Sequence, residues 1–371
     1  MSTSYFDPSS GALYPLDVPR WRGDDGAALL LTPGAGIGRD DIERGTRSLW
    51  RYRAALAGDI AAPITMGEGC TPLVERAWGD LRPMFKCEWF SATGSFKDRG
   101  ASVMLSFLRQ QGVRAVLEDS SGNGGSAIAG YGAAGGMRVK VLAPATTSPA
   151  KIAQVRAYGA EVELVEGPRE ASQDEAIRQS AKIFYASHNW HPFFIEGVKT
   201  LAYELWEDFG FAAPDAVIVP VGAGSLLLGL HFGFGELLRA GQIGRAPRLY
   251  AAQPANCAPV AASFAGAGPC EFKPTIAEGT AIKAPLRLAT LLEALRETGG
   301  EAVAIPEEEI VAALRRLATM GLFVEPTSAT AAAALDRLHA AGRIGPRERV
   351  VVVLSGSGLK AASKVAELCA G

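Results

Sequence analysis

Four loops rich in glycine and serine could bind an anion through their backbone N–H groups. They are Ser91–Gly100, Ser120–Ser126, Val221–Ser225 and Ser355–Gly358. Each follows a run of residues typical of a strand and leads into a helical pattern, and in open α/β sheets ligands bind at such positions. Glycine lets the backbone approach a ligand closely, and the start of a helix offers N–H groups to phosphate. The loops therefore predict a site for a small phosphorylated ligand.

The first of these loops contains a lysine, Lys97, where a helix is expected to begin. A cation is unfavourable at that end of a helix, because the helix dipole is positive there. One interpretation is a solvated lysine side chain. The other is a Schiff base with an aldehyde cofactor, which converts the amine into an imine. The residues alone leave both interpretations open.

A nucleotide is a poorer match for the same loops. Gly122-x-Gly124-x-x-Ala127 nearly repeats the dinucleotide-binding pattern, which also has an acidic residue about 20 positions further on, at the end of the next strand. The next expected strand, Val139–Ala143, is followed by Pro144–Thr147, which contains no acid. The chain has no G-x-x-x-x-G-K-[ST] run and no strand-to-helix turn with G-x-S-x-G. A nicotinamide dehydrogenase, a P-loop enzyme and a serine hydrolase are therefore not predicted.

The elements that position these loops alternate between strand and helix. Short apolar runs predict strands at Met84–Phe90, Ala115–Asp119, Val139–Ala143, Glu161–Val165, Ala216–Val219, Leu249–Ala252 and Val350–Leu354. Helices are predicted at Pro149–Tyr158 and at Glu307–Met320, whose acids come first and arginines later, as the helix dipole favours. Because such alternation is typical of parallel βαβ units, the predicted fold class is α/β.

One uncharged stretch, Ala216–Gly235, is long enough to span a bilayer. It contains Pro220 and five glycines, and it lacks flanking anchor residues. We therefore expect a buried strand, a glycine loop and a helix, and no membrane partner.

Charge and cysteine content argue against some partners and types of site. The 371 residues include 37 Lys and Arg against 39 Asp and Glu, a net charge of −2, which argues against a nucleic-acid partner. The five cysteines form no C-x-x-C pair, so neither a disulfide framework nor a zinc site is expected. Residues 1–20 lack the basic and apolar runs of a signal peptide, which favours a cytoplasmic location.

Three runs together identify a family. Thr93–Gly100, Ser120–Gly125 and Glu196–Thr200 resemble the corresponding motifs of the threonine synthases, which are fold type II (tryptophan synthase β-like) pyridoxal-phosphate enzymes. The similarity continues in Gly67–Leu73 and Leu354–Lys360. It implies two open, twisted α/β domains with pyridoxal 5′-phosphate (PLP) in the cleft between them. Residues 1–60 would form an arm or small lobe on the larger domain, 61–190 the smaller domain and 191–371 the larger domain. A homodimer and a small amino-acid substrate are also implied.

The resemblance assigns roles to individual residues. Lys97 would form the Schiff base and move the α-proton of the substrate, and Asn123 would bind the 3′-oxygen of the cofactor. The cofactor phosphate would lie on the N–H groups of Gly222, Ala223, Gly224 and Ser225. The substrate carboxylate would be bound by Ser120, Ser121, Gly122 and Asn123, with help from Thr93 or Ser95. Ser355 would face the pyridine nitrogen; because a hydroxyl leaves the ring a weaker electron sink, elimination or replacement is expected rather than transamination.

The segment before Glu196 departs from the family pattern. Threonine synthases have Asn-Ser-x-Asn-Pro-x-Arg here, and this chain has Phe194 at the arginine position and His191 at an asparagine position. Phenylalanine cannot replace an arginine as a partner for phosphate. The resemblance implies a threonine-synthase-type lyase acting on O-phosphohomoserine. The alternative is a threonine or serine ammonia-lyase that yields a 2-oxo acid and ammonia, or another threonine-synthase-like PLP enzyme. Trp190, Phe193 and Phe194 either line an aromatic pocket or belong to the core.

His188 and His191 have H-x-x-H spacing. A metal site requires further ligands, and the remaining histidines, His231 and His339, are far away in the sequence. No metal is therefore expected, and His191 is predicted to contact the substrate instead.

Overall fold

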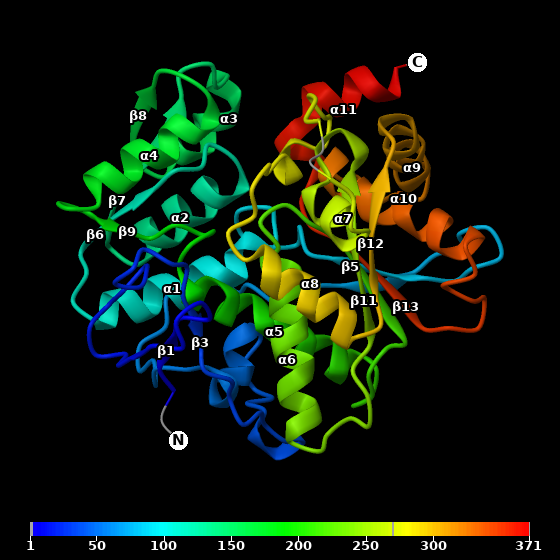
Figure 1. Ribbon diagram of the computed structural model, residues 1–371, viewed down its shortest axis with the longest axis horizontal. Coiled ribbons are helices and arrows are strands. Elements are labelled where there is room, and N and C mark those ends of the chain that lie inside the picture. Colours follow the sequence, from blue (N-terminus) through cyan, green and yellow to red (C-terminus); the bar gives the residue numbers. More distant parts are fainter. Residues whose placement is uncertain (1–2, 269–270, 371) are drawn as a thin grey trace. The chain divides into compact units, whose positions relative to one another are not determined.

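The chain forms two compact units that interleave along the sequence in the computed structural model (Figure 1), which describes residues 3–268 and 271–370. The first unit contains the residues up to Gly69 together with Lys97–Thr200, and the second contains Cys70–Phe96 together with the chain from Leu201 onward. Cys270 lies outside the described residues. Each unit has its own sheet of mainly parallel strands, which confirms the predicted α/β class.

The sheet of the first unit has the strand order β8-β7-β6-β9, and all of its strands are parallel. The strands are β6 (Ala115–Glu118), β7 (Arg138–Pro144), β8 (Glu161–Val165) and β9 (Phe184–Tyr185). The helices are α1 (Lys97–Gln110), α2 (Asn123–Ala134), α3 (Pro149–Ala157) and α4 (Arg169–Gln179). Helix α5 (Pro192–Asp208) begins in this unit, and α2 and α4 both pack on β7.

The N-terminal residues of this unit form a small antiparallel sheet with the order β2-β1-β3. Its strands are β1 (Tyr5–Phe6), β2 (Leu13–Tyr14) and β3 (Leu30–Leu31), and the 3-10 helix η2 (Leu49–Ala55) follows. Strands of two residues are too short to show an alternation of apolar and polar residues in the sequence.

The sheet of the second unit has the order β12-β11-β10-β13-β5-β4. It comprises β4 (Leu73–Glu75), β5 (Met84–Cys87), β10 (Ala216–Pro220), β11 (Arg248–Pro254), β12 (Glu301–Ile305) and β13 (Val350–Leu354). Its helices are α6 (Ser225–Arg239), α7 (Pro259–Phe264), α8 (Leu288–Glu297), α9 (Glu307–Thr319), α10 (Pro326–Ala340) and α11 (Ala362–Cys369). Every residue of β10 and β13 is buried, as expected for strands covered on both faces.

The uncharged stretch at 216–235 has the predicted form, because β10 leads through a glycine loop into α6. Among the described residues, no helix is both long and apolar enough to cross a bilayer. Two strands of this sheet were not predicted, and they form its two edges: β4, which pairs antiparallel with β5, and β12, which pairs parallel with β11.

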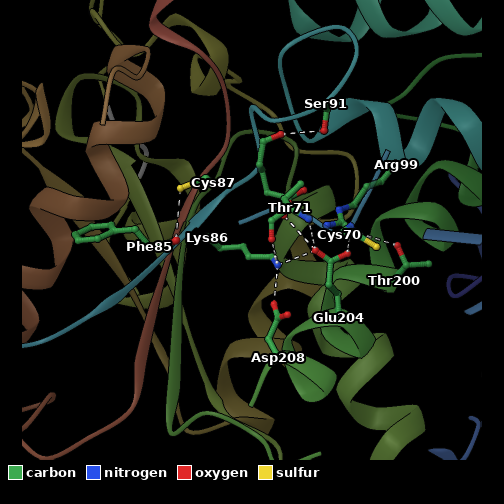
Figure 2. Close-up of polar contacts among 11 residues, drawn as sticks. Cys70, Thr71, Phe85, Lys86, Cys87, Ser91, Arg99, Thr200, Glu204 and Asp208 are labelled. Atoms are coloured by element: carbon green, nitrogen blue, oxygen red, sulfur yellow. Dashed lines mark hydrogen bonds and ion pairs between the residues drawn. The ribbon is translucent and has the colours of Figure 1, made fainter. Parts of the chain in front are cut away.

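A buried ion cluster joins β5 to the last turns of α5 in the second unit (Figure 2). The Lys86 Nζ lies 2.7 Å from Glu204 Oε1 and 2.7 Å from Asp208 Oδ2, and it donates to the carbonyl oxygen of Thr71 at 2.8 Å. The Glu204 carboxylate also accepts the backbone N–H groups of Cys70 and Thr71, each at 2.8 Å. The Lys86 side chain is fully buried, so the two carboxylates compensate a charge that water cannot reach.

Candidate active site

Lys97 is the first residue of α1, as the sequence predicts, and close packing against α5 fixes this helix. A Cβ atom on Gly197 of α5 would lie 2.1 Å from the carbonyl oxygen of Arg99 and 3.0 Å from the Cα of Gly100. Only glycine at position 197 therefore allows the two backbones to approach so closely. The Glu196–Thr200 motif thus positions the helix that carries Lys97.

The carboxylate of Glu68 connects α1 to its neighbours within the first unit. Its Oε1 accepts the Nε1–H of Trp50 at 3.0 Å and the hydroxyl of Ser102 at 2.6 Å. Its Oε2 accepts the hydroxyl of Tyr131, on α2, at 2.7 Å. Because these donors are buried, the network stabilises the spacing of α1, α2 and η2.

The loop between β6 and α2 contains the predicted substrate-binding residues. Asn123 begins α2, and the Oγ of Ser120 accepts the N–H of Gly122 at 3.3 Å. A Cβ on Gly125 would lie 1.8 Å from the carbonyl oxygen of Ser120, so the turn requires glycine there. The helix cap at Gly122 makes no side-chain hydrogen bond, and the first turn of α2 can therefore offer its N–H groups to an anion.

The three aromatic residues ahead of Glu196 have different surroundings. Phe194 packs against the first turn of α1: a Cβ on Gly100 would lie 2.6 Å from its ring, and the Nζ of Lys97 lies 5.5 Å from the ring centre. Phe193 stacks on Phe107 in the core with ring centres 3.7 Å apart. Trp190 packs edge-on against another tryptophan of the same unit. Phe194 is thus the aromatic residue that adjoins Lys97.

The two histidines of the H-x-x-H run also lie in different places. His191 is fully buried beside Tyr5, Phe184 and Phe193, and its Nδ1 accepts the N–H of Phe193 at 3.3 Å. His188 packs against the substrate loop instead, because a Cβ on Gly124 would be 2.6 Å from its Nδ1. The substrate contact assigned to His191 stays a prediction. Across the described residues, no group of three or more His, Cys, Asp and Glu side chains is arranged to hold a metal ion.

The predicted phosphate loop lies in the second unit, between β10 and α6. Gly224 has a φ of +91°, and a Cβ there would lie 2.3 Å from the side chain of Leu291. A Cβ on Gly222 would lie 3.0 Å from the Cα of Thr280, so a neighbouring loop closes one side of the turn. Ser225 begins the 15-residue helix α6. A tight glycine turn at the start of a helix fits a phosphate group.

Ser355, at the end of β13, lies in a network with a serine that the sequence analysis missed. The Oγ atoms of Ser355 and Ser328, on α10, are 3.1 Å apart, and Ser328 also accepts the N–H of Gly356 at 2.9 Å. The segment before Lys97 pairs with the same loop, because the N–H of Phe96 donates to the carbonyl oxygen of Ser355 at 2.9 Å. The structure thus holds Ser355 both through its hydroxyl and through its backbone carbonyl.

Ser95 belongs to this pairing through a backbone bridge to Gly356. Its hydroxyl is fully buried and has no hydrogen-bond partner within residues 3–268 and 271–370. Such a group normally has a partner, so it points to a ligand. Thr93 is also buried, and its carbonyl oxygen accepts the Nζ of Lys360 at 2.9 Å.

The predicted site residues therefore form two sets. The first unit contains Lys97, Ser120, Ser121, Gly122, Asn123 and His191, and the second contains Thr93, Ser95, Gly222, Ala223, Gly224, Ser225 and Ser355. The glycine turn ahead of α6 and the unpartnered hydroxyl of Ser95 fit a phosphorylated cofactor with further polar groups. The first set supplies an amine beside a helix start that can bind an anion.

Comparison with known proteins gives consistent results. A family model described as pyridoxal-phosphate dependent enzyme matches residues 64–356. Threonine synthase from Methanocaldococcus jannaschii is 33% identical over 338 residues, which cover 87% of this chain and 83% of that protein. Threonine synthase from Mycobacterium tuberculosis (strain H37Rv) is 33% identical over 320 residues, which cover 83% of this chain and 87% of that protein. Among solved structures, the processed form of threonine deaminase isoform 2 from Solanum lycopersicum has a TM-score of 0.71 at 25% identity. The match covers 92% of this chain and 97% of that one. Serine racemase from Dictyostelium discoideum has a TM-score of 0.64 at 25% identity, and the match covers 77% of this chain and 92% of that one.

Proposed function

Since the chain belongs to the pyridoxal-phosphate-dependent enzymes and is a lyase with the type II fold, we propose that it eliminates a leaving group from the side chain of a small amino acid without a phosphate group. The observation that carries the proposal is the position of Phe194, which packs on the first turn of α1 beside Lys97. It stands where the sequence of a threonine synthase has the arginine that binds the substrate phosphate.

The residues that would hold PLP follow from the family motifs in this chain. We assign the covalent attachment to Lys97, the phosphate to the turn from Gly222 to Ser225, the 3′-oxygen to Asn123 and the pyridine nitrogen to Ser355. When bound, PLP supplies an electron sink for the α-carbon of the amino acid.

Side chains of this protein perform the other tasks. The Nζ of Lys97 would take the α-proton of the substrate. The loop from Ser120 to Gly122 would bind the carboxylate at the start of α2, where the helix dipole favours an anion. The hydroxyl of Ser355 would not hold the pyridine ring protonated as a carboxylate would, which would favour elimination over transamination.

Our proposal for the substrate rests on the buried ring of Phe194 beside Lys97. A phosphate needs charged or N–H donors, and the ring of Phe194 offers none. A hydroxy amino acid does not require such a partner, and its elimination would yield a 2-oxo acid and ammonia. O-phosphohomoserine is the second candidate, because relatives that are 33% identical over most of the chain are named threonine synthases.

The first experiment measures cofactor binding and elimination together. Purified protein is saturated with PLP, its visible absorbance is recorded, and pyruvate is assayed after addition of 3-chloro-L-alanine, whose chloride leaves without a proton. We expect a visible band and pyruvate from the wild type and from Lys182→Ala, which changes an exposed lysine of the same unit. Lys97→Ala should lose both. A band and pyruvate formation that survive in Lys97→Ala would overturn the assignment.

A further inference from the structure

A buried polar cluster lies at the carboxyl end of β6, next to the substrate loop. Glu118 ends this strand and Asp119 follows it, and both side chains are buried. The Oε1 of Glu118 lies 2.9 Å from the Nδ1 of His188, and its Oε2 accepts the backbone N–H of His188 at 3.0 Å. Asp119 accepts the hydroxyl of Tyr185 at 2.7 Å and that of Ser187 at 3.2 Å. Glu118 thus fixes both the ring and the backbone of His188.

The imidazole of His188 occupies space that a side chain on the substrate loop would otherwise fill. A Cβ on Gly124 would lie 2.6 Å from its Nδ1 and 2.7 Å from its Cε1. The opposite neighbour is Phe194, whose ring centre is 5.7 Å from that of His188 and 5.5 Å from the Nζ of Lys97. His188 therefore lies between the substrate loop and the ring that adjoins Lys97.

One nitrogen of this buried ring is available to a ligand. His188 is only 6% exposed, and its Nδ1 is held by Glu118. Its Nε2 has no hydrogen-bond partner among the residues that the structure describes. Because Nε2 is not one of the buried side-chain atoms that lack a partner, it can be reached from outside the fold, and a substrate on the adjoining loop could contact it.

We propose that His188 is a catalytic acid that protonates a hydroxyl leaving group of the substrate through Nε2, and that Glu118 is a positioning residue that passes a proton to Nδ1. The proposal rests on the elimination proposed above and deepens it, because it names the leaving group. Phosphate and chloride leave as stable anions, whereas hydroxide needs a proton in order to leave as water.

The step balances within this pair. Before it, Glu118 is protonated and donates to Nδ1, and the neutral ring carries its hydrogen on Nε2. Removal of the α-proton by Lys97 provides the electron pair that forms the Cα–Cβ double bond as the Cβ–O bond breaks. The departing oxygen takes the Nε2 hydrogen and leaves as water, while the proton of Glu118 moves to Nδ1. The pair ends as a carboxylate hydrogen-bonded to a neutral ring, and solvent restores the proton.

The surrounding charges are compatible with this proton count. Burial raises the pKa of Glu118 to about 7, even though the backbone N–H of His188 and the charge of Lys97 oppose the change. Burial, assisted by the charges of Lys97 and Arg169, lowers the pKa of His188 well below its ordinary value, so the ring is neutral. Asp119 acts on His188 in the opposite direction, and its own pKa is raised by burial and by Glu118. The pair therefore holds its extra proton on the carboxyl group near neutral pH.

The test compares leaving groups in the PLP-loaded protein. Pyruvate formation is measured with L-serine, whose hydroxyl needs a proton, and with 3-chloro-L-alanine, whose chloride does not. For His188→Asn we expect kcat/KM with L-serine to fall about 10²- to 10⁴-fold, the usual contribution of an acid catalyst, and kcat/KM with 3-chloro-L-alanine to change less than about threefold. His231→Asn is the matched control: His231 lies 3.5 Å from Glu297 in the second unit, and its loss should change neither rate.

The pH profile tests the part assigned to Glu118. With L-serine, wild-type kcat/KM should fall as the pH rises through about 7, because the carboxyl group loses the proton that the step consumes. This limb should be absent with 3-chloro-L-alanine and in Glu118→Gln. Equal losses with both substrates in His188→Asn, or no loss with either, would overturn the proposal. If the wild type eliminates neither leaving group, the proposed function itself fails, which is a different result.

Discussion

The close crossing of α1 and α5 predicts that Gly197→Ala destabilises the first unit. The new Cβ would lie 2.1 Å from the carbonyl oxygen of Arg99, whereas a comfortable contact needs about 3.5 Å. The two backbones must therefore separate by roughly 1.4 Å. Overpacking of this kind costs up to about 3 kcal/mol, and the better helix propensity of alanine returns about 1 kcal/mol. The net loss is about 2 kcal/mol, or about 4–8 °C in Tm for a unit of this size.

Thermal unfolding of the cofactor-free protein, followed by circular dichroism, measures this loss. The matched control is Gly235→Ala in α6, where the nearest atom to a new Cβ is the flexible Arg239 Nη1 at 3.4 Å. Alanine should there stabilise the helix by about 0.5–1 kcal/mol. The two substitutions are chemically identical and should shift Tm in opposite directions. A Gly197→Ala protein at least as stable as the wild type would refute the argument that backbone contact requires glycine at this position.

Three further predictions follow from buried polar groups. Lys86→Met should reduce the free energy of unfolding by about 3–5 kcal/mol in a urea titration, because it removes a buried cation that lies 2.7 Å from the buried carboxylate of Glu204; an unchanged midpoint would contradict this. Ser328→Ala removes the acceptor of the Gly356 N–H and a contact of the Ser355 hydroxyl, so the Kd for PLP should rise about tenfold, equal to ~1.4 kcal/mol. An unchanged Kd in a fluorescence titration with PLP would contradict this. Because burial raises the pKa of Glu118 from 4.5 to about 7, the wild type should lose stability relative to Glu118→Gln as the pH rises from about 4.5 to 7, with no further change above that range; Tm differences that stay constant with pH would exclude it.

Parts of the fold with a strong period or an apolar run could be predicted from the sequence. The strands at Glu161–Val165 and Val350–Leu354 have the predicted bounds, and the helix at Glu307–Thr319 differs by one residue. The strand β12 was missed because its residues alternate weakly and are only partly buried. The antiparallel pairing of β4 depends on a partner that local sequence does not specify.

The local setting of the candidate site followed from its motifs, whereas its supporting contacts did not. The motifs predicted that Lys97 begins a helix and that the loop Ser120–Ser126 leads into one. The structure confirms the first start, and it begins the second helix at Asn123, inside the expected loop. Nothing in the sequence indicated that His188 rather than His191 packs against the substrate loop, because this depends on how the segment before α5 turns. Ser328 was missed because it is 27 residues from its partner and lies in a helix of small residues.

The measurement that tests the central claim most directly compares two kinds of substrate with the PLP-loaded wild type. Phosphate and threonine are assayed with O-phospho-L-homoserine, and 2-oxo acid and ammonia are assayed with L-serine and L-threonine. The proposal predicts a 2-oxo acid from a hydroxy amino acid and little phosphate release, because Phe194 replaces the phosphate-binding arginine. Rapid phosphate release coupled to threonine, with no 2-oxo acid from either hydroxy amino acid, would contradict it.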